Sequence, residues 1–150
     1  MSTNQPLAIL FLCTGNSCRS QMAEGWTRAL HGDRYQVYSA GIEAHGLNAK
    51  AVQVMHEAGV DITGQKSQRL DALADVELDV VVTVCGHADE NCPVLRLNCR
   101  KLHVPFDDPP ALARKSANEA AGLEHYRRVR DEIQEFARQL PEVLSAEPTR

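Results

Sequence analysis

A cysteine and an arginine bracket a short polar loop directly after the apolar run at residues 7–12. An unbroken apolar run of this kind is typical of a strand buried on both faces of a parallel sheet. Arg19 closes the loop, with five residues between it and Cys13, and a helix is expected to begin near Ser20, with Ser20 as its N-cap. The chain must therefore leave a buried strand, turn tightly and enter a helix, which favours an α/β fold.

A loop at this position can bind an oxyanion. Several of its backbone N–H groups can turn inward and form an anion-binding nest at the N-terminus of the helix. The Arg19 guanidinium is suited to bidentate contact with a tetrahedral anion. The same positive field is expected to lower the pKa of the Cys13 thiol, so that a nucleophilic thiolate exists at neutral pH. The alternative to a catalytic loop is that Cys13 is a buried apolar residue at the strand end and Arg19 a solvated surface charge. The predicted oxyanion-binding residues are Thr14, Gly15, Asn16, Ser17, Cys18 and Arg19.

Composition narrows the function class. The chain has 150 residues, a formal net charge of −4, no basic stretch and no apolar run long enough to span a membrane. We therefore expect one catalytic domain over residues 1–150 with a frayed tail at 145–150, a cytoplasmic location, and no nucleic-acid or membrane partner. A monomer is the default. Five cysteines in a reducing compartment are better interpreted as reactive thiols, metal ligands or core residues than as structural disulfides.

Strands and helices alternate along the chain, which predicts a parallel sheet with helices on both faces. Asn48 is expected to cap one helix and Gly59 to end it. The longest helix is expected to be nicked near Gly122 and Pro141. The predicted strands are 7–12, 35–40, 78–84 and 101–104, and the predicted helices are 20–31, 48–58, a weak one at 67–74, and 118–144.

A second cysteine cluster follows the predicted strand at 78–84. The carboxyl ends of parallel strands meet at one sheet edge, so Cys85 is expected near Cys13, although simple burial of Cys85 is the alternative. Zinc is disfavoured, because six residues separate Cys85 from Cys92, and Cys92 from Cys99, whereas structural zinc sites use about two to four.

The segment between Cys85 and Cys92 is predicted to rearrange on oxidation. If residues 86–91 were helical, the two cysteines would lie about 10 Å apart, whereas a disulfide needs Cα atoms within about 7 Å. Gly86, Asp89, Asn91 and Pro93 disfavour a helix here, so that unwinding the segment costs little free energy.

An acidic pair follows the last predicted strand, in the sequence Phe-Asp-Asp-Pro-Pro at 106–110. A carboxylate at this edge can act as general acid toward a leaving oxygen. We assign that role to Asp108, with Asp107 a solvated neighbour or a hydrogen-bonding brace. Pro109 and Pro110 are expected to hold the backbone extended and fix the reach of Asp108. A purely structural turn is the alternative for both acids.

Four motifs together resemble the thioredoxin-coupled arsenate reductases of the low-molecular-weight protein tyrosine phosphatase superfamily. They are CTGNSCRSQMAEGW at 13–26, YSAGIE at 38–43, Asp-x-Asn-Cys-Pro at 89–93, and FDDP at 106–109. The resemblance implies the low-molecular-weight phosphatase fold, a four-stranded parallel sheet flanked by helices. It also implies the reduction of arsenate to arsenite without a cofactor, for arsenic detoxification.

The resemblance further implies residue roles. Cys13 attacks arsenate held by the loop and Arg19, while Asp108 protonates the departing oxygen. Cys85 then attacks Cys13, Cys92 resolves the resulting disulfide, and thioredoxin reduces the Cys85–Cys92 disulfide. Ser20 is expected to steady the Cys13 thiolate.

The chain departs from the family pattern at a potassium site that some members carry. Asn16, Glu24 and Ser39 match it, but Gln68 stands at the aspartate position. The nearby Lys66 ammonium is expected to replace the cation, giving weak or absent potassium dependence. No resident metal is predicted. Residues 111–122 and Cys99 receive no role, and Cys18 is expected to be a packing residue.

Two other functions stay open. A tyrosine phosphatase could use Cys13, Arg19 and Asp108, but the aromatic residues that usually sandwich a phenol ring do not follow Asp108. A thiol redox sensor or arsenite-binding protein would rest on Cys85, Cys92 and Cys99. It would not need Cys13. Of the histidines, His45 and His87 are weakly suspected near the site.

Overall fold

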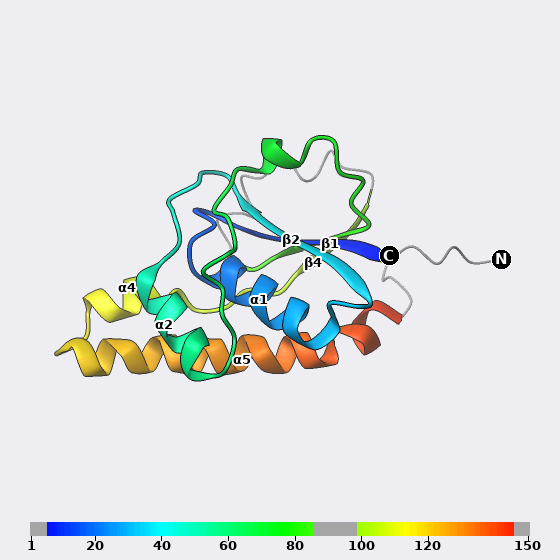
Figure 1. The fold of residues 1–150 in the computed structure, drawn as a ribbon. Coiled ribbons are helices and arrows are strands. Elements are labelled where there is room, and N and C mark those ends of the chain that lie inside the picture. Colours follow the sequence, from blue (N-terminus) through cyan, green and yellow to red (C-terminus); the bar gives the residue numbers. More distant parts are fainter. Residues whose placement is uncertain (1–5, 86–98, 146–150) are drawn as a thin grey trace.

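The computed structural model describes residues 6–85 and 99–145, which form a four-stranded sheet in the order β2-β1-β3-β4 (Figure 1). All three strand pairs are parallel. The predicted α/β class with a four-stranded parallel sheet is confirmed. The predicted strand positions hold to within a few residues, with β3 shorter than expected and β4 beginning one residue earlier. The strands are β1 (Leu7–Cys13), β2 (Tyr35–Gly41), β3 (Val80–Thr83) and β4 (Arg100–His103).

The two central strands, β1 and β3, lie at the centre of the hydrophobic core. Residues 8–13 of β1 and all of β3 are buried, as an unbroken apolar run predicts for strands between two neighbours. Helices α1 and α5 lie side by side along the sheet, and the short 3₁₀ helix η1 lies on its other side in the view of Figure 1. The helices are α1 (Arg19–His31), α2 (Ala49–Glu57), α4 (Pro109–Arg114) and α5 (Glu119–Ser145), with η1 at Leu70–Leu73.

The helix termini test the sequence signals directly. Asn48 caps α2 as predicted, because its Oδ1 accepts hydrogen bonds from the amides of Lys50 and Ala51 at 2.9 and 3.0 Å. Gly59 then takes a φ of +91°, the left-handed conformation that ends a helix. The predicted cap of α1 is wrong: the N-cap position is Cys18, without a side-chain hydrogen bond, and Ser20 lies inside the helix.

Helix α5 has the predicted length, lies one residue later in the chain, and is more regular than predicted. It runs without a break from Glu119 to Ser145, with Gly122 and Pro141 inside it. Asn118 Oδ1 accepts the amide of Ala121 at 2.8 Å and so satisfies one N-terminal donor. The predicted weak helix at 67–74 is reduced to the single 3₁₀ turn η1, and residues 146–150 of the expected tail lie outside the described part.

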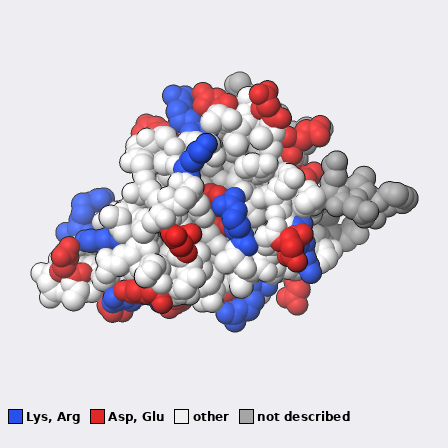
Figure 2. All heavy atoms as spheres, in the orientation of Figure 1, with Lys and Arg blue, Asp and Glu red and all other residues white. Residues whose placement is uncertain are grey.

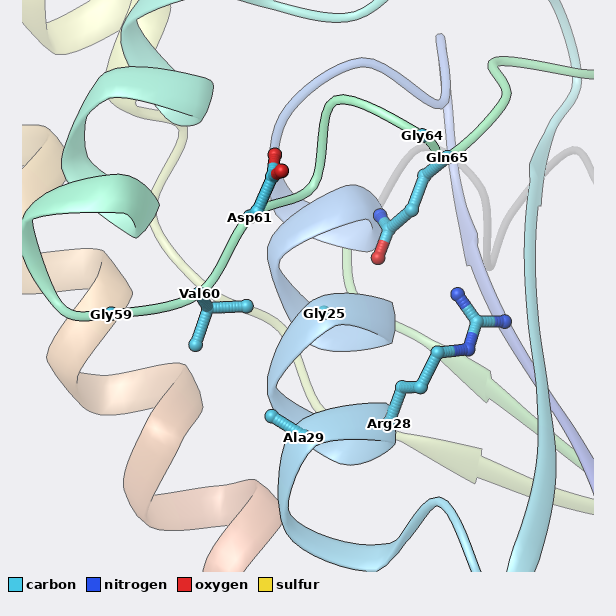
Figure 3. Close-up of a pocket in the computed structure, with 8 residues that line it drawn as sticks. All are labelled: Gly25, Arg28, Ala29, Gly59, Val60, Asp61, Gly64 and Gln65. Carbon is cyan, nitrogen blue, oxygen red and sulfur yellow. The ribbon is translucent and has the colours of Figure 1, made fainter.

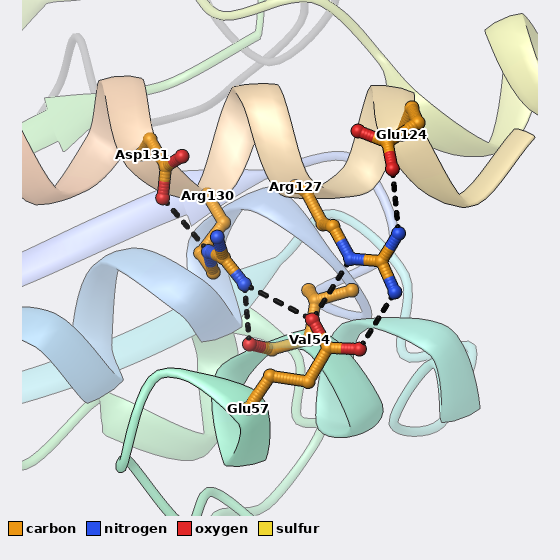
Figure 4. A network of polar contacts seen from close by, with 6 residues as sticks. All are labelled: Val54, Glu57, Glu124, Arg127, Arg130 and Asp131. Atoms are coloured by element: carbon orange, nitrogen blue, oxygen red, sulfur yellow. Dashed lines mark hydrogen bonds and ion pairs between the residues drawn. The ribbon is translucent and has the colours of Figure 1, made fainter. Parts of the chain in front are cut away.

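An ion network fastens α5 to α2. Arg127 donates to both carboxylate oxygens of Glu57, at 2.9 and 2.8 Å, and to Glu124 on its own helix at 2.7 Å (Figure 4). Arg130 donates to the Val54 carbonyl at 3.0 Å. The Arg127 hydrogen bond lowers the pKa of Glu57, which favours the charged pair. The network fixes α2, and with it the chain that enters α2, against the longest helix.

Helix α4 was not predicted. Pro109 and Pro110 occupy its first two positions, so the expectation that they hold the chain extended is wrong. A proline lacks an N–H group, and the first turn of a helix needs none, which makes this a favourable place for it. Asp108 itself is extended, with φ −93° and ψ 100°, as a residue before proline should be.

None of the helices formed by the described residues combines the length and apolar character that a membrane crossing requires.

Candidate active site

The carboxyl ends of β1, β3 and β4 meet at one edge of the sheet, where the end of β1 and the loop after it line a cavity of about 350 Å³. Strand β1 leads to β2 on one side and lies beside β3 on the other, which is the switch point where α/β sheets bind ligands. Cys13 and Arg19 lie at this cavity together with Asp108, as predicted. The lining residues are Cys13, Thr14, Gly15, Ser17, Cys18, Arg19, His45, Asp108, Pro110 and Arg114.

The loop after Cys13 turns its amides away from the neighbouring chain. The carbonyls of Thr14, Gly15 and Ser17 each accept a 2.9 Å hydrogen bond, from the amides of residues 43, 45 and 48 respectively. In a trans peptide the following N–H points opposite to the carbonyl, so the amides of residues 15, 16 and 18 face away from that segment. Within the described residues these three amides donate to no acceptor. Amides in this arrangement form a nest that can bind an anion.

Asn16 holds the loop in shape. Its φ of +49° is a left-handed conformation, which asparagine tolerates better than most residues. Its buried side chain accepts the Gln68 amide at 2.7 Å and donates to Ser20 Oγ at 2.9 Å. Ser20, expected to steady the Cys13 thiolate, therefore supports Asn16 in the described hydrogen bonds. The loop is rigid because both ends of the Asn16 amide are engaged.

Gly41 lets β2 approach this loop closely. A Cβ built there would lie 2.8 Å from both the Thr14 carbonyl oxygen and the Asn16 nitrogen. Any side chain at this position would push the loop out of place, which gives a physical reason for the glycine within the YSAGIE motif.

The Arg19 side chain is mostly buried, and its hydrogen-bond donors are only partly satisfied. Its Nη1 donates to the Phe106 carbonyl at 3.1 Å, and its Nη2 lies 3.6 Å from Asp108 Oδ1. Its Nε is buried and has no hydrogen-bond partner among the described residues. A buried donor without an acceptor costs free energy, and an oxyanion in the cavity would supply that acceptor.

Cys13 and Cys85 lie together, as predicted from the sheet edge. Thr14 Oγ1 is 3.2 Å from Cys85 Sγ, and both cysteines are buried. The hydrogen bond with Cys85 and burial raise the pKa of Cys13, against the opposing effects of Arg19 and the Thr14 amide. The expectation of a lowered pKa is therefore wrong here, because it considered only the positive field of the loop and not a second thiol in contact with Cys13.

The two adjacent aspartates point in different directions. Asp108 lines the cavity beside Arg19, whereas Asp107 accepts from Arg128 of α5 at 3.0 Å. Arg128 thereby braces the strand end that presents Asp108. This arrangement matches the division of roles drawn from the sequence.

The expected replacement of potassium by Lys66 is wrong. Glu24 is buried, accepts from Ser39 Oγ at 2.5 Å and pairs with Arg28 at 2.5 Å, one helical turn away. Lys66 is exposed. Arg28 also lines a second cavity of about 340 Å³ between α1 and residues 59–65 (Figure 3). The i, i+4 spacing of Glu24 and Arg28 was a signal in the sequence that could have identified this pair.

We expect the wild-type chain to unfold at the same temperature in KCl and in NaCl, because Arg28 already neutralises Glu24. Replacing Arg28 with methionine leaves a buried carboxylate and should cost about 2 kcal/mol, less than a fully buried pair because Arg28 is half exposed. Potassium should then stabilise the variant selectively. Thermal unfolding in the two salts measures this, with the exposed Arg34→Met as control. A potassium-dependent wild type would contradict it.

The remaining sequence assignments divide into three groups. Cys92, His87 and the predicted rearrangement at 86–91 lie outside the described residues. Cys18 is buried, and burial raises its pKa to about 12, which suits a packing residue. No group of three His, Cys, Asp or Glu side chains in the described part could hold a metal ion.

Two lining residues were missed or undervalued. His45 contacts the loop through its amide and pairs with Glu43 at 2.5 Å. Arg114 was not predicted as a site residue, because it lies on α4, a helix that was not predicted from the sequence.

Comparisons with known proteins agree with this geometry. The model for the family "Low molecular weight phosphotyrosine protein phosphatase" matches residues 8–149. Arsenate reductase 2 of Staphylococcus haemolyticus is 52% identical over 125 residues, covering 83% of this chain and 88% of that protein. Arsenate reductase of Bacillus subtilis is 51% identical over 125 residues with the same coverage.

Solved structures give the same picture. "An arsenate reductase in the phosphate binding state" superposes with a TM-score of 0.75 at 30% identity, covering 91% of this chain and 98% of that one. The tyrosine phosphatase amsI of Erwinia amylovora, at 22% identity and a TM-score of 0.73, covers 95% of each chain and shares the fold.

Proposed function

Since the chain belongs to the low molecular weight phosphotyrosine protein phosphatase family, we propose that within it this protein reduces arsenate to arsenite. The observation that carries the proposal is the thiol pair. A phosphatase needs one nucleophilic cysteine, whereas here Cys85 hydrogen-bonds Cys13 at the base of the oxyanion loop. A second thiol in contact with the nucleophile equips the site to form a disulfide, which is a two-electron oxidation.

The first step is nucleophilic substitution at arsenic. The loop amides and Arg19 hold arsenate, the Cys13 thiolate forms an S–As bond, and one As–O bond breaks. Asp108 gives its proton to the departing oxygen, which leaves as water. Arg19 can contact the anion and hold Asp108 beside it, since it lines the cavity and lies 3.6 Å from Asp108.

The second step moves two electrons to arsenic. The Cys85 thiolate attacks Cys13 Sγ, the S–As bond breaks with its electron pair on arsenic, and arsenite departs. The products are As(III) and a Cys13–Cys85 disulfide, so atoms and electrons balance. Thr14 Oγ1, 3.2 Å from Cys85 Sγ, can donate a hydrogen bond to the attacking thiolate and stabilise it.

Cys92 enters from the sequence alone, because it lies outside the described residues. We propose that its thiolate attacks Cys85 Sγ, releases Cys13, and leaves a Cys85–Cys92 disulfide. A thioredoxin dithiol then reduces that disulfide and is itself oxidised. We further propose that the chain acts in the cytoplasm, as a single catalytic domain and a monomer, in arsenic detoxification.

The cavity also bears on the alternatives. No phenylalanine, tyrosine or tryptophan is among the described residues that line it, which favours a small inorganic oxyanion over a phenolic ester. Cys13, Arg19 and Asp108 nevertheless suffice for hydrolysis of a simple aryl phosphate. A redox sensor or arsenite-binding protein would not require the oxyanion loop.

The test is arsenite release from arsenate with the thioredoxin system, with wild type beside Cys92→Ser. We expect continuous turnover by the wild type and a single stoichiometric round by the variant. If both proteins fail to release arsenite yet hydrolyse an aryl phosphate, the phosphatase alternative replaces the proposal. Survival of thiol responses in Cys13→Ser would point to the sensor.

A further inference from the structure

The charged residues that line the active-site cavity do not all balance. Arg19 lies 3.6 Å from Asp108, and His45 pairs with Glu43. Arg114 is exposed, and no carboxylate in the described part lies within ion-pair distance of its guanidinium. Arg114 therefore supplies the uncompensated positive charge at this cavity.

The fold holds Arg114 in place. Helix α4 begins immediately after Asp108, with two prolines in its first turn, so its start is tied to the acid. Its other side packs against α5, where Gly122 admits Ala113 so closely that a Cβ at residue 122 would lie 3.1 Å from Ala113 Cβ. Arg114, one residue further on, thus projects from a short, braced helix at the mouth of the cavity.

The rest of the surface gives an anion little help. The chain carries a net charge of −4, and Figure 2 shows basic and acidic side chains interspersed over one face of the molecule. The field that an incoming anion meets is then set by the charges nearest the cavity. Arg19 already contacts the Phe106 carbonyl and the Asp108 carboxylate, so its positive charge is partly compensated before an anion binds.

We propose that Arg114 is a specificity-determining residue that selects the oxyanion by its charge. Arsenate and phosphate become doubly charged near neutral pH, whereas arsenite is an uncharged acid there. A cation at the cavity mouth favours the substrate over that product. That the substrate is arsenate rests on the proposed function. The effect of Arg114 on anion binding requires only that the oxyanion loop binds an anion.

The experiment measures binding of inorganic phosphate, as the concentration that half-protects Cys13 from iodoacetamide, at low and at physiological salt. Arg114→Gln should bind phosphate about tenfold more weakly at low salt, equivalent to about 1.4 kcal/mol. Arg114→Lys should restore most of the affinity. The matched control is Lys115→Gln, which removes the same charge from the next residue, outside the cavity lining, and should change affinity less than twofold.

Salt dependence separates an electrostatic role from a structural one. Wild-type affinity should fall with added salt, and Arg114→Gln should lose most of that dependence. In arsenate turnover, the same variant should raise KM and leave kcat unchanged.

Equal phosphate affinities for Arg114→Gln and Lys115→Gln would overturn the inference. Failure of the proposed function is a different result, in which wild type binds phosphate with the expected Arg114 dependence yet releases no arsenite.

Discussion

Replacing Cys85 with alanine is expected to abolish arsenate turnover while sparing hydrolysis of an aryl phosphate. Without the second thiol the S–As adduct cannot collapse to a disulfide, so arsenite release should fall at least about 1,000-fold, as in enzymes that lose a nucleophile. Phosphoryl transfer needs only Cys13, Arg19 and Asp108 and should continue. Arsenite release and aryl phosphate hydrolysis, measured on the same preparation, give the contrast.

The same variant tests the cause of the raised Cys13 pKa. The hydrogen bond with Cys85 is the largest contribution to that rise, ahead of burial, so its loss should lower the pKa. The thiolate fraction of Cys13 then increases at a given pH, and the midpoint of its alkylation should move to lower pH. Cys99→Ala removes a half-buried thiol elsewhere and serves as control. Wild-type arsenite turnover by Cys85→Ala would rule out the disulfide step.

Replacing Arg19 should impair both reactions together. Arg19→Ala removes the buried fork from the oxyanion loop and should lower kcat/KM for arsenate and for aryl phosphate by about 10²–10³, as loss of one oxyanion donor does elsewhere. Arg19→Lys keeps the charge but cannot contact Phe106, Asp108 and the anion at once, so it should recover little. Steady-state kinetics on the two substrates measure both effects.

The control for these arginine variants is Arg138→Ala on the exposed side of α5, where Arg138 pairs with Glu135. It should leave both activities unchanged. If Arg19→Lys retained wild-type kcat/KM, bidentate recognition by Arg19 would be wrong and the loop amides would have to account for anion binding.

The sequence was sufficient where one local interaction determines the structure. The apolar run of β1, the Asn48 cap and the Gly59 stop depend on neighbours in the chain, and all three were predicted. It was insufficient where two local rules conflict. Pro109 and Pro110 fit an extended chain as well as a first helical turn, and only the packing of α4 on α5 decides between them.

The candidate site divides in the same way. The pairing of Cys13 with Arg19 follows from loop spacing, and the approach of Cys85 follows from parallel strand order. The raised pKa of Cys13 depends on contact between side chains of β1 and the end of β3, which no local pattern encodes. Lys66 was predicted as the replacement cation because it stands near Gln68 in the sequence. Arg28, which lies one helical turn after Glu24 and pairs with it, was overlooked.

Strand spacing has a consequence for the redox chemistry. Leu12 pairs with Thr83, and the Val84 amide donates to the Leu12 carbonyl at 3.0 Å, so Cys13 and Cys85 follow neighbouring strands with an offset of one residue. Adjacent strands lie about 4.8 Å apart, and disulfide-linked Cα atoms lie about 4.4–6.8 Å apart. The spacing of the two strands thus falls within the range that a disulfide requires. Oxidation of Cys13 and Cys85 is therefore expected to need rotation of their side chains, with β1 and β3 keeping their spacing.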